Sequence, residues 1–226
     1  MIDICVKKLD DTWVGLAYTE EKIVATSLSY NKENTLKSLL KSLPPNAEHR
    51  IVENGSHFAE RTISTLKEVH LGRQELKDFT LAAEYVPEPL ASVLKAAATI
   101  PIGYVASYGN IAKAAGTEPK LVGQIMASNP LYPIVPCHRV VGSDLSLVGY
   151  GGRKNPRALK NKLTRLEAER KGHKSQKEIP INETKLTVYP VEQAIEKAKK
   201  QGLSLSDKRQ RTLTSYEPEK YSSKKL

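Results

Sequence analysis

The sequence has few cysteines and no long apolar run. Only two cysteines occur in 226 residues, Cys5 and Cys137, too few for a disulfide framework. No stretch reaches the roughly 18 apolar residues that a membrane-spanning helix needs. The first residues, "MIDICVKKLDD", lack the apolar segment of a secretory signal. We therefore expect a protein of the reducing cytoplasm with no membrane association.

Other scarcities limit the kinds of site that the chain can build. Two cysteines exclude a Cys-rich zinc site, and no His–Cys spacing completes a ligand set, so we expect no metal. Hydrophobic residues make up 39% and aromatic residues 6%, enough for a lean core that leaves part of the chain unpacked. The formal net charge of +10 suits a polyanionic partner, but it equally suits a solvated basic surface.

Residues 1–85 have the pattern of a small N-terminal α/β domain. Three stretches rich in β-branched and aromatic residues, separated by polar turns, predict an antiparallel meander: residues 3–9, 12–19 and 22–30. Leucines at helical spacing predict a helix over 32–43, stopped by two prolines, and a second helix is expected over 57–72. The proline-punctuated stretch 78–89 is interpreted as the connector between domains.

Residues 86–171 are predicted to form a mostly helical C-terminal domain, which makes the whole chain α+β. A helix over 88–100 precedes "YGNIAKAAG", a short helix that ends at Gly116, and a further helix starts at Pro119. Helix, tight turn and helix is the helix-turn-helix pattern, although many helical hairpins share it. A short strand, "RVVG", and a last helix over 156–170 complete this domain.

From residue 172 the composition becomes polar and Lys-rich. The stretch "VEQAIEKAKKQG" predicts one amphipathic helix, and the rest of 172–226 is interpreted as a loosely ordered tail or appended element. Its lysines suit phosphate binding, and a solvated extension accounts for them equally well.

Cys137, in "PLYPIVPCHRVVG", is the residue whose surroundings point to chemistry. A lone buried cysteine is most often only a small hydrophobe. Here, however, it follows a proline at the end of an apolar run, and His138 and Arg139 supply an imidazole and a permanent cation. A thiol attacks well only as thiolate, which such neighbours favour. Glu167 is a candidate to hold the imidazole, and Asn129 a candidate to brace the turn.

These residues match a family pattern. The stretch "PCHRVVG", preceded by "ASNPLYPIV" and followed by "GYGG", resembles the O6-alkylguanine-DNA alkyltransferases. The resemblance covers residues 88–170 firmly. It covers 1–87 only in layout, which is similar to the ribonuclease-H-like N-terminal domain of that family, and it says nothing of 172–226.

The resemblance implies direct repair of double-stranded DNA that contains alkylated guanine. The damaged base is flipped out of the duplex, and its alkyl group passes irreversibly to Cys137 in a single turnover. O4-alkylthymine is an expected second substrate. No cofactor is implied, because the DNA itself is the alkyl donor, and a monomer is the simplest expectation.

The resemblance also assigns catalytic roles. Cys137 is the nucleophile, His138 the base that takes the thiol proton through a water, and Glu167 the residue that holds His138. Asn129 braces the active-site turn. Tyr108 donates a proton or hydrogen bond to the leaving guanine, which leaves poorly as an anion.

The substrate-binding residues implied are Tyr150, as a wall of the base pocket, the backbone of Val140 at the base edge, and Arg139 beside the nucleophile. Lys120 occupies the position of an arginine that the family inserts into the base stack. Lysine keeps the charge but loses the stacking plane, which predicts a less effective placeholder. Gly123 matches a small residue that lets the helix approach the minor groove.

Three alternatives remain open at this stage. A non-catalytic protein that binds alkylated bases would use the same scaffold, although such relatives replace the cysteine. An alkylation-sensing regulator would read a promoter in the major groove. A thiol hydrolase would need an oxyanion hole, for which the sequence has no motif.

Overall fold

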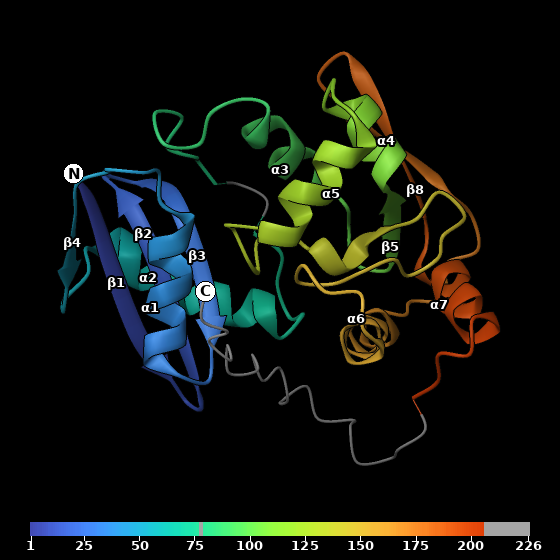
Figure 1. Cartoon of the computed structure of the whole chain (residues 1–226), viewed down its shortest axis with the longest axis horizontal. Helices are drawn as coiled ribbons and strands as arrows, with labels where there is room; N and C mark the ends of the chain where they lie inside the picture. The colour runs from blue at the N-terminus through green and yellow to red at the C-terminus, as the bar shows by residue number, and fades with distance from the viewer. Residues whose placement is uncertain (77–78, 206–226) are drawn as a thin grey trace, which may run out of the picture.

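The chain folds into two neighbouring units, each built around a four-stranded sheet (Figure 1). The computed structural model describes residues 1–76 and 79–205. The predicted α+β class is confirmed, and the two units lie side by side with the N-terminal sheet at one end of the molecule.

The N-terminal sheet contains the predicted meander plus one strand that was not predicted. Its order is β3-β2-β1-β4, with bounds β1 Ile2–Leu9, β2 Thr12–Thr19, β3 Lys22–Ser29 and β4 His49–Val52. Asp10 and Glu20, both at positive φ, make the two tight turns between the antiparallel strands. Strand β4 pairs in parallel with β1. It is short and mostly exposed, so it lacks the apolar alternation that identifies a strand.

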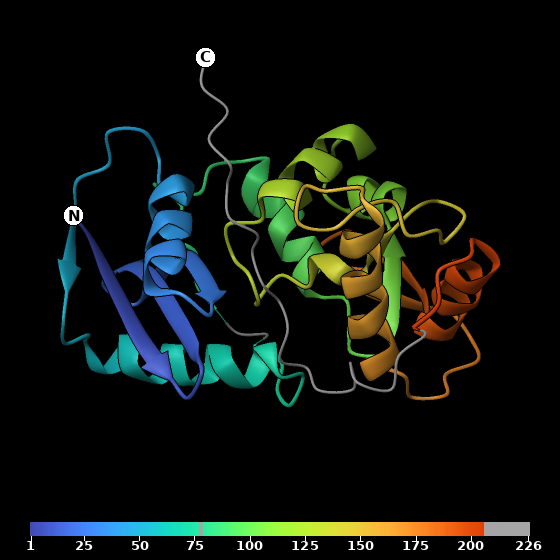
Figure 2. The same ribbon diagram turned by 60° about the horizontal axis from the view of Figure 1, so that its bottom comes forward.

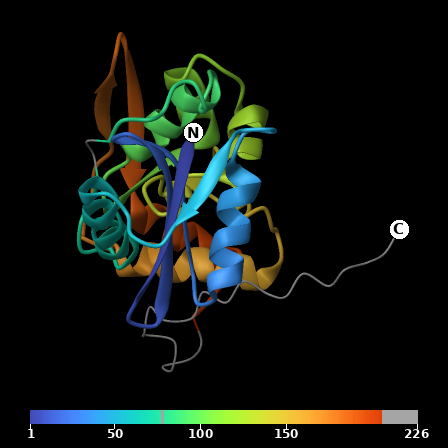
Figure 3. The same cartoon turned by 90° about the vertical axis from the view of Figure 1, so that its left-hand side faces the viewer.

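Helices α1 (Lys32–Ser42) and α2 (His57–His70) cover opposite faces of this sheet (Figures 2 and 3). Both begin at a residue whose side chain accepts a backbone N–H, Asn31 for α1 and Ser56 for α2. Because alternate residues of a strand face opposite sides, each helix has its own apolar cluster. The two predicted helices are confirmed.

The C-terminal unit contains the remaining helices: α3 Leu90–Ala98, α4 Tyr108–Ala114, α5 Pro119–Ser128, α6 Pro156–Ala168 and α7 Val191–Lys200. The predicted helix-turn-helix pair is α4 and α5. Gly116, at φ 64°, makes the turn after α4, and Pro119 stands in the first turn of α5.

A second sheet makes this unit less helical than predicted. Its order is β6-β5-β8-β7, with bounds β5 Tyr104–Ser107, β6 Val140–Val141, β7 Lys177–Ile181 and β8 Thr184–Pro190. Strand β6 is the predicted "RVVG" strand, and it follows a single 3-10 turn, η1 Cys137–Arg139.

Of the two interpretations of 172–226, a loose tail or an appended element, the appended element is the one that fits residues 177–200. They form the β7–β8 hairpin and α7, which add two strands and a helix to the C-terminal unit (Figure 1). Leu186, Val188 and Pro190 alternate inward along β8, whereas its exposed residues are polar. Helix α7 is the predicted amphipathic helix. Residues 206–226 of the predicted Lys-rich tail lie outside the described residues.

One apolar cluster runs through both units. It includes Leu16 and Ile63 from the N-terminal sheet and α2, together with Leu94, Val135 and Cys137 from the C-terminal unit. The predicted boundary at residue 85 stays a prediction.

Residues 1–76 and 79–205 contain neither a candidate membrane span nor a candidate metal cluster. None of the helices there combines the length and apolarity of a membrane span. No three Asp, Glu, His or Cys side chains in those ranges lie close enough together to hold a metal ion.

Candidate active site

Cys137 lies at the start of η1, deep in the C-terminal unit. The buried segment from Pro133 to Pro136 leads into it, and its backbone N–H donates to the Val135 carbonyl at 2.9 Å. Only 8% of the residue is exposed. Burial raises the pKa of the Cys137 thiol above its ordinary value, and Asn129, Lys162 and Arg165 oppose that rise. The resting group is therefore a protonated thiol that needs help to ionise.

Asn129 spans the segment that leads to the cysteine. Its side-chain NH2 donates to the Val135 carbonyl at 2.8 Å, and its carbonyl oxygen accepts the Leu131 N–H at 3.0 Å. Both hydrogen bonds fix the backbone on either side of the Tyr132–Pro133 peptide. The predicted brace of the active-site turn thus lies where the prediction placed it.

His138 is buried and hydrogen-bonded on one side only. Its Nε2 lies 2.7 Å from Oε1 of Glu169, and its Nδ1 is a buried atom with no hydrogen-bond partner within the described ranges. Because an ionised carboxylate only accepts, the proton of a neutral imidazole resides on Nε2, which leaves a lone pair on Nδ1. Burial lowers the pKa of His138 to about 4, although Glu169 works in the opposite direction.

The prediction that Glu167 holds His138 is wrong; Glu169 does so. Glu169 continues the buried face of α6 from Leu166, three residues earlier, whereas Glu167 is rotated about 100° away. Glu167 instead pairs with Arg170 and Lys199, each at 3.4 Å. Burial raises the pKa of Glu169, but its interactions with His138 and Arg139 outweigh this and bring it down to about 2.

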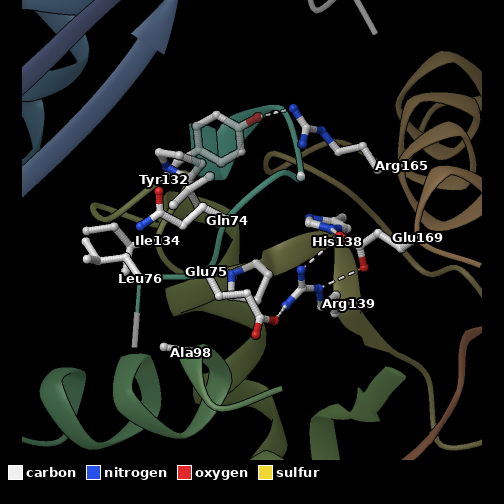
Figure 4. Close-up of a pocket in the computed structure, with 14 residues that line it drawn as sticks. Gln74, Glu75, Leu76, Ala98, Tyr132, Ile134, His138, Arg139, Arg165 and Glu169 are labelled. Atoms are coloured by element: carbon white, nitrogen blue, oxygen red, sulfur yellow. Dashed lines mark hydrogen bonds and ion pairs between the residues drawn. The ribbon is translucent and has the colours of Figure 1, made fainter. Parts of the chain in front are cut away.

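The guanidinium of Arg139 has its hydrogen-bond partners within the protein, and its predicted substrate contact stays a prediction. Its guanidinium donates to Oε2 of Glu169 at 2.8 Å, to Oε1 at 3.0 Å and to Glu75 at 3.4 Å (Figure 4). It also donates to the Ile100 carbonyl at 2.6 Å. A buried guanidinium is tolerated only with such partners. Its observable role is to fix the carboxylate that holds His138.

Two tyrosines lie near the nucleophile. Tyr108 is the first residue of α4, and burial together with the neighbouring Cys137 raises its pKa to about 12. It is therefore a phenol, able to donate, across the physiological range. Tyr150 is 7% exposed and opens the glycine turn that precedes α6.

The backbone of Val140 already makes hydrogen bonds within the protein. Its N–H donates to the Cys137 carbonyl, and its carbonyl accepts from Nζ of Lys162. A base contact would have to use the second lone pair of that carbonyl, so this predicted contact stays a prediction.

Lys162 is a site residue that the sequence analysis missed. It is fully buried, and its Nζ also donates to the Gly149 carbonyl at 3.0 Å, which ties the strand after Cys137 to the loop before Tyr150. Burial lowers the pKa of Lys162 to about 8, and Cys137 opposes this. The signal was present, because Lys162 falls on the same face of α6 as Leu163 and Leu166.

The two predicted DNA-contacting residues lie on α5. Lys120 is exposed in the first turn. Gly123 lies about one turn later, and a Cβ added there would meet no described atom within 4 Å apart from its chain neighbours and the backbone of its own helix. This part of α5 is open to a close partner, and both roles stay predictions.

Comparisons with known proteins agree with the geometry. Residues 89–171 match the model of the 6-O-methylguanine DNA methyltransferase DNA-binding domain. The chain is 40% identical over 121 residues to the methylated-DNA--protein-cysteine methyltransferase of Mycobacterium leprae, a match covering 52% of this chain and 68% of that protein. It is 58% identical over 53 residues to that of Pyrobaculum aerophilum, of which the match spans only 36%.

Solved structures share the fold. The O6-methylguanine-DNA methyltransferase of Pyrococcus kodakaraensis superposes with a TM-score of 0.54 at 22% identity, over 75% of this chain and 99% of that one. Mycobacterium tuberculosis OGT in complex with DNA gives a TM-score of 0.52 at 25% identity, over 74% and 92%. With the buried Cys137, the His138–Glu169 pair and the helix-turn-helix, these matches confirm the resemblance: the chain belongs to the methylated-DNA–protein-cysteine methyltransferase family.

Proposed function

We propose that the protein repairs double-stranded DNA by taking the alkyl group of O6-alkylguanine onto Cys137, in one irreversible turnover per molecule. The observation that supports this best is the buried His138, whose Nε2 is held by Glu169 while the Nδ1 lone pair has no described partner. At neutral pH such an imidazole is uncharged, with its one proton on Nε2 and a lone pair on Nδ1 that can accept another, and it is adjacent in the chain to the only thiol in the motif.

The reaction balances with groups of this chain and the substrate. The Cys137 proton passes to Nδ1 of His138 through a water, and the thiolate attacks the alkyl carbon. The S–C bond forms as the bond from that carbon to O6 of guanine breaks. Tyr108 gives the departing guanine a proton, which restores a neutral base. The proton on His138 then replaces the one that Tyr108 has lost. No redox partner or cofactor enters this balance.

The low pKa of His138 fits a base that works only in the transition state. At rest its proton affinity is too low to ionise Cys137, so a buried unpaired thiolate is avoided. Glu169 stabilises the imidazolium that forms as the proton moves. Lys162 is a nearby positive charge that lowers the energy of the thiolate.

For DNA binding we propose that α5 enters the minor groove with Lys120 as the placeholder for the flipped base and Gly123 at the closest approach. Tyr150 and the Val140 carbonyl would contact the extruded base. O4-alkylthymine as a second substrate, a monomeric state and a cytoplasmic location are further parts of this proposal.

One experiment tests the function directly. The protein is incubated with duplex DNA that contains one O6-methylguanine, and intact protein and Cys137 peptides are weighed. We expect a gain of one methyl group per molecule on Cys137 and none in Cys137→Ser. Binding without any mass gain would favour a non-catalytic lesion-binding protein, and repeated turnover would favour a hydrolase; either result overturns the proposal.

A further inference from the structure

Three side chains from separate parts of the chain meet beside the active site. Arg165 on α6 donates to the Tyr132 hydroxyl, and its NH2 group lies 3.0 Å from Nδ1 of His70 at the end of α2. Nδ1 of His70 also lies 2.9 Å from that hydroxyl. The guanidinium carbon lies 5.4 Å from the centre of the Tyr132 ring, and the His70 ring meets the same ring edge-on. This cluster joins the N-terminal unit to the helix that holds Glu169.

Tyr132 lies within the segment that leads to the nucleophile, and a second contact from the N-terminal unit fixes its backbone. Thr26 on β3 donates through its hydroxyl to the Tyr132 carbonyl at 2.8 Å, and its N–H donates to the Pro130 carbonyl at 2.8 Å. The segment is thus held to an edge of the N-terminal sheet by its backbone and to α2 by its side chain. A shift of α2 or β3 would move the backbone that fixes Cys137.

Arg165 also brings charge to the site. Arg165 lines a cavity of about 30 Å³ together with Tyr132, His138 and Glu169. Figure 4 shows these side chains. Besides Arg165, the charged or titratable groups acting on Cys137 are Lys162 from the same helix and Tyr108 from α4. Burial alone would lower the pKa of Arg165, but the charges of four neighbours raise it: Tyr132, Tyr150, Cys137 and Glu169. The guanidinium therefore acts on the thiol in two ways. Its positive charge favours the thiolate, and its hydrogen bond to Tyr132 holds the segment that leads to Cys137.

We propose that Arg165 is a positioning residue for Cys137, and that His70 and Tyr132 hold its guanidinium so that the N-terminal unit helps set the reactivity of the nucleophile. This rests on the proposed function of Cys137, but it concerns residues outside the helix-turn-helix and outside the His138–Glu169 pair. The positive charge stabilises the thiolate, while its hydrogen bonds keep the Tyr132 segment in register.

The test measures the thiol without DNA. The rate at which iodoacetamide labels Cys137 is followed from pH 7 to 11.5 by mass spectrometry of the Cys137 peptide, which separates it from Cys5. Arg165→Met should move the midpoint of the rate upward by about one pH unit, since a nearby opposite charge typically lowers a pKa by that much or more. Below the midpoint, labelling should then slow roughly tenfold and recover at high pH.

Matched variants separate charge from structure. Arg170→Met removes the same charge from an exposed position at the end of the same helix, and its midpoint should equal that of the wild type. Arg165→Lys keeps the charge and should leave the midpoint nearly unchanged. His70→Leu and Tyr132→Phe should shift it partway, whereas His70→Asn, whose side-chain oxygen can replace Nδ1 as acceptor, should not.

The labelling midpoint of Arg165→Met decides whether this inference holds. Equal midpoints in Arg165→Met and the wild type, or equal shifts in Arg165→Met and Arg170→Met, would overturn it. If Arg165→Met fails to fold, the His70 and Tyr132 variants decide, because unchanged midpoints in both would contradict the proposal. The methyl-transfer assay remains separate: a wild type that accepts no methyl group removes the proposed function, whatever the iodoacetamide profiles show.

Discussion

At the scale of single residues, two glutamates two residues apart at the C-terminal end of α6 have different partners. Glu169 binds His138 and Arg139, and Glu167 binds solvent-exposed cations. Residue type cannot show which of the two glutamates binds His138, because positions 167 and 169 carry the same side chain. Only the direction in which each side chain leaves the helix decides it. The prediction of Glu167 failed by two residues for this reason, whereas Cys137, His138 and Asn129 lie in a contiguous motif that leaves no such ambiguity.

This difference between the glutamates yields a matched pair of variants. Glu169→Gln should slow methyl transfer about 100-fold, since a positioned acid–base system contributes at least that much and the amide cannot stabilise an imidazolium. Glu167→Gln should change the rate less than twofold. Single-turnover transfer from O6-methylguanine DNA, with DNA affinity measured separately, checks both. Equal slowing of the two variants would show that the assignment of Glu169 is wrong.

Lys162 and Arg165 are buried or half-buried basic residues that composition alone could not identify as part of the site. Both are basic residues in a sequence with 35 lysines and arginines, so nothing in the composition distinguishes them from surface charges. Only their phase on α6, on or near the face of Leu166, indicates burial. Their hydrogen bonds to Val140, Gly149 and Tyr132 depend on loops whose paths the sequence does not specify.

At the scale of helices and strands, most of the fold could be predicted from local sequence patterns. Helices α1 and α2 and the helix-turn-helix have apolar spacing of about 3.6 residues and are followed by prolines or glycines, whereas β-branched and aromatic residues between polar turns indicate the meander. The β7–β8 hairpin could not be recognised in the same way, because Pro180 and many charged residues obscure its short alternation. Strand β5, only four residues long and buried, had no pattern of its own.

Helix α5 offers a test of the DNA-facing surface. Gly123→Ala should raise the free energy of unfolding by up to about 1 kcal/mol, because alanine is the better helix former and the added methyl group meets nothing. The same change should weaken binding to lesion-containing duplex, roughly tenfold if it costs about 1.4 kcal/mol of contact.

Urea unfolding and fluorescence anisotropy with labelled duplex measure the two effects of Gly123→Ala. Gln124→Ala, an exposed neighbour on the same helix, is the control and should leave affinity nearly unchanged. A Gly123→Ala protein that binds DNA as tightly as the wild type would argue that another face of α5 meets the duplex.

At the scale of the whole molecule, buried histidines should make the fold sensitive to acid. Burial lowers the pKa of His70 to about 3, helped by Arg165 and His138, and burial lowers that of His138 to about 4. An unfolded histidine titrates near 6.5, so below that pH the unfolded chain binds protons that the folded chain does not. Stability therefore falls as the pH drops from 6.5 towards 4.

At pH 5 each such histidine should lower the free energy of unfolding by about 2 kcal/mol relative to pH 7.5. Urea unfolding at the two pH values measures this, and His70→Asn should recover about half of the loss. His49→Gln, which alters an exposed histidine, is the control. Equal stability at both pH values, or no recovery in His70→Asn, would contradict the prediction.

The added hairpin has a consequence for where this protein can be divided. The family match stops at residue 171, but β8 pairs with β5, and Val191, Ala194 and Ile195 of α7 pack on Leu163 and Leu166 of the helix that supplies Glu169. A polypeptide trimmed to residues 89–171 would leave the edge of β5 unpaired where β8 pairs with it. It would also expose the apolar face of α6, next to the Glu169 carboxylate. The segment that the family model matches and the segment that folds together therefore end at different residues in this chain.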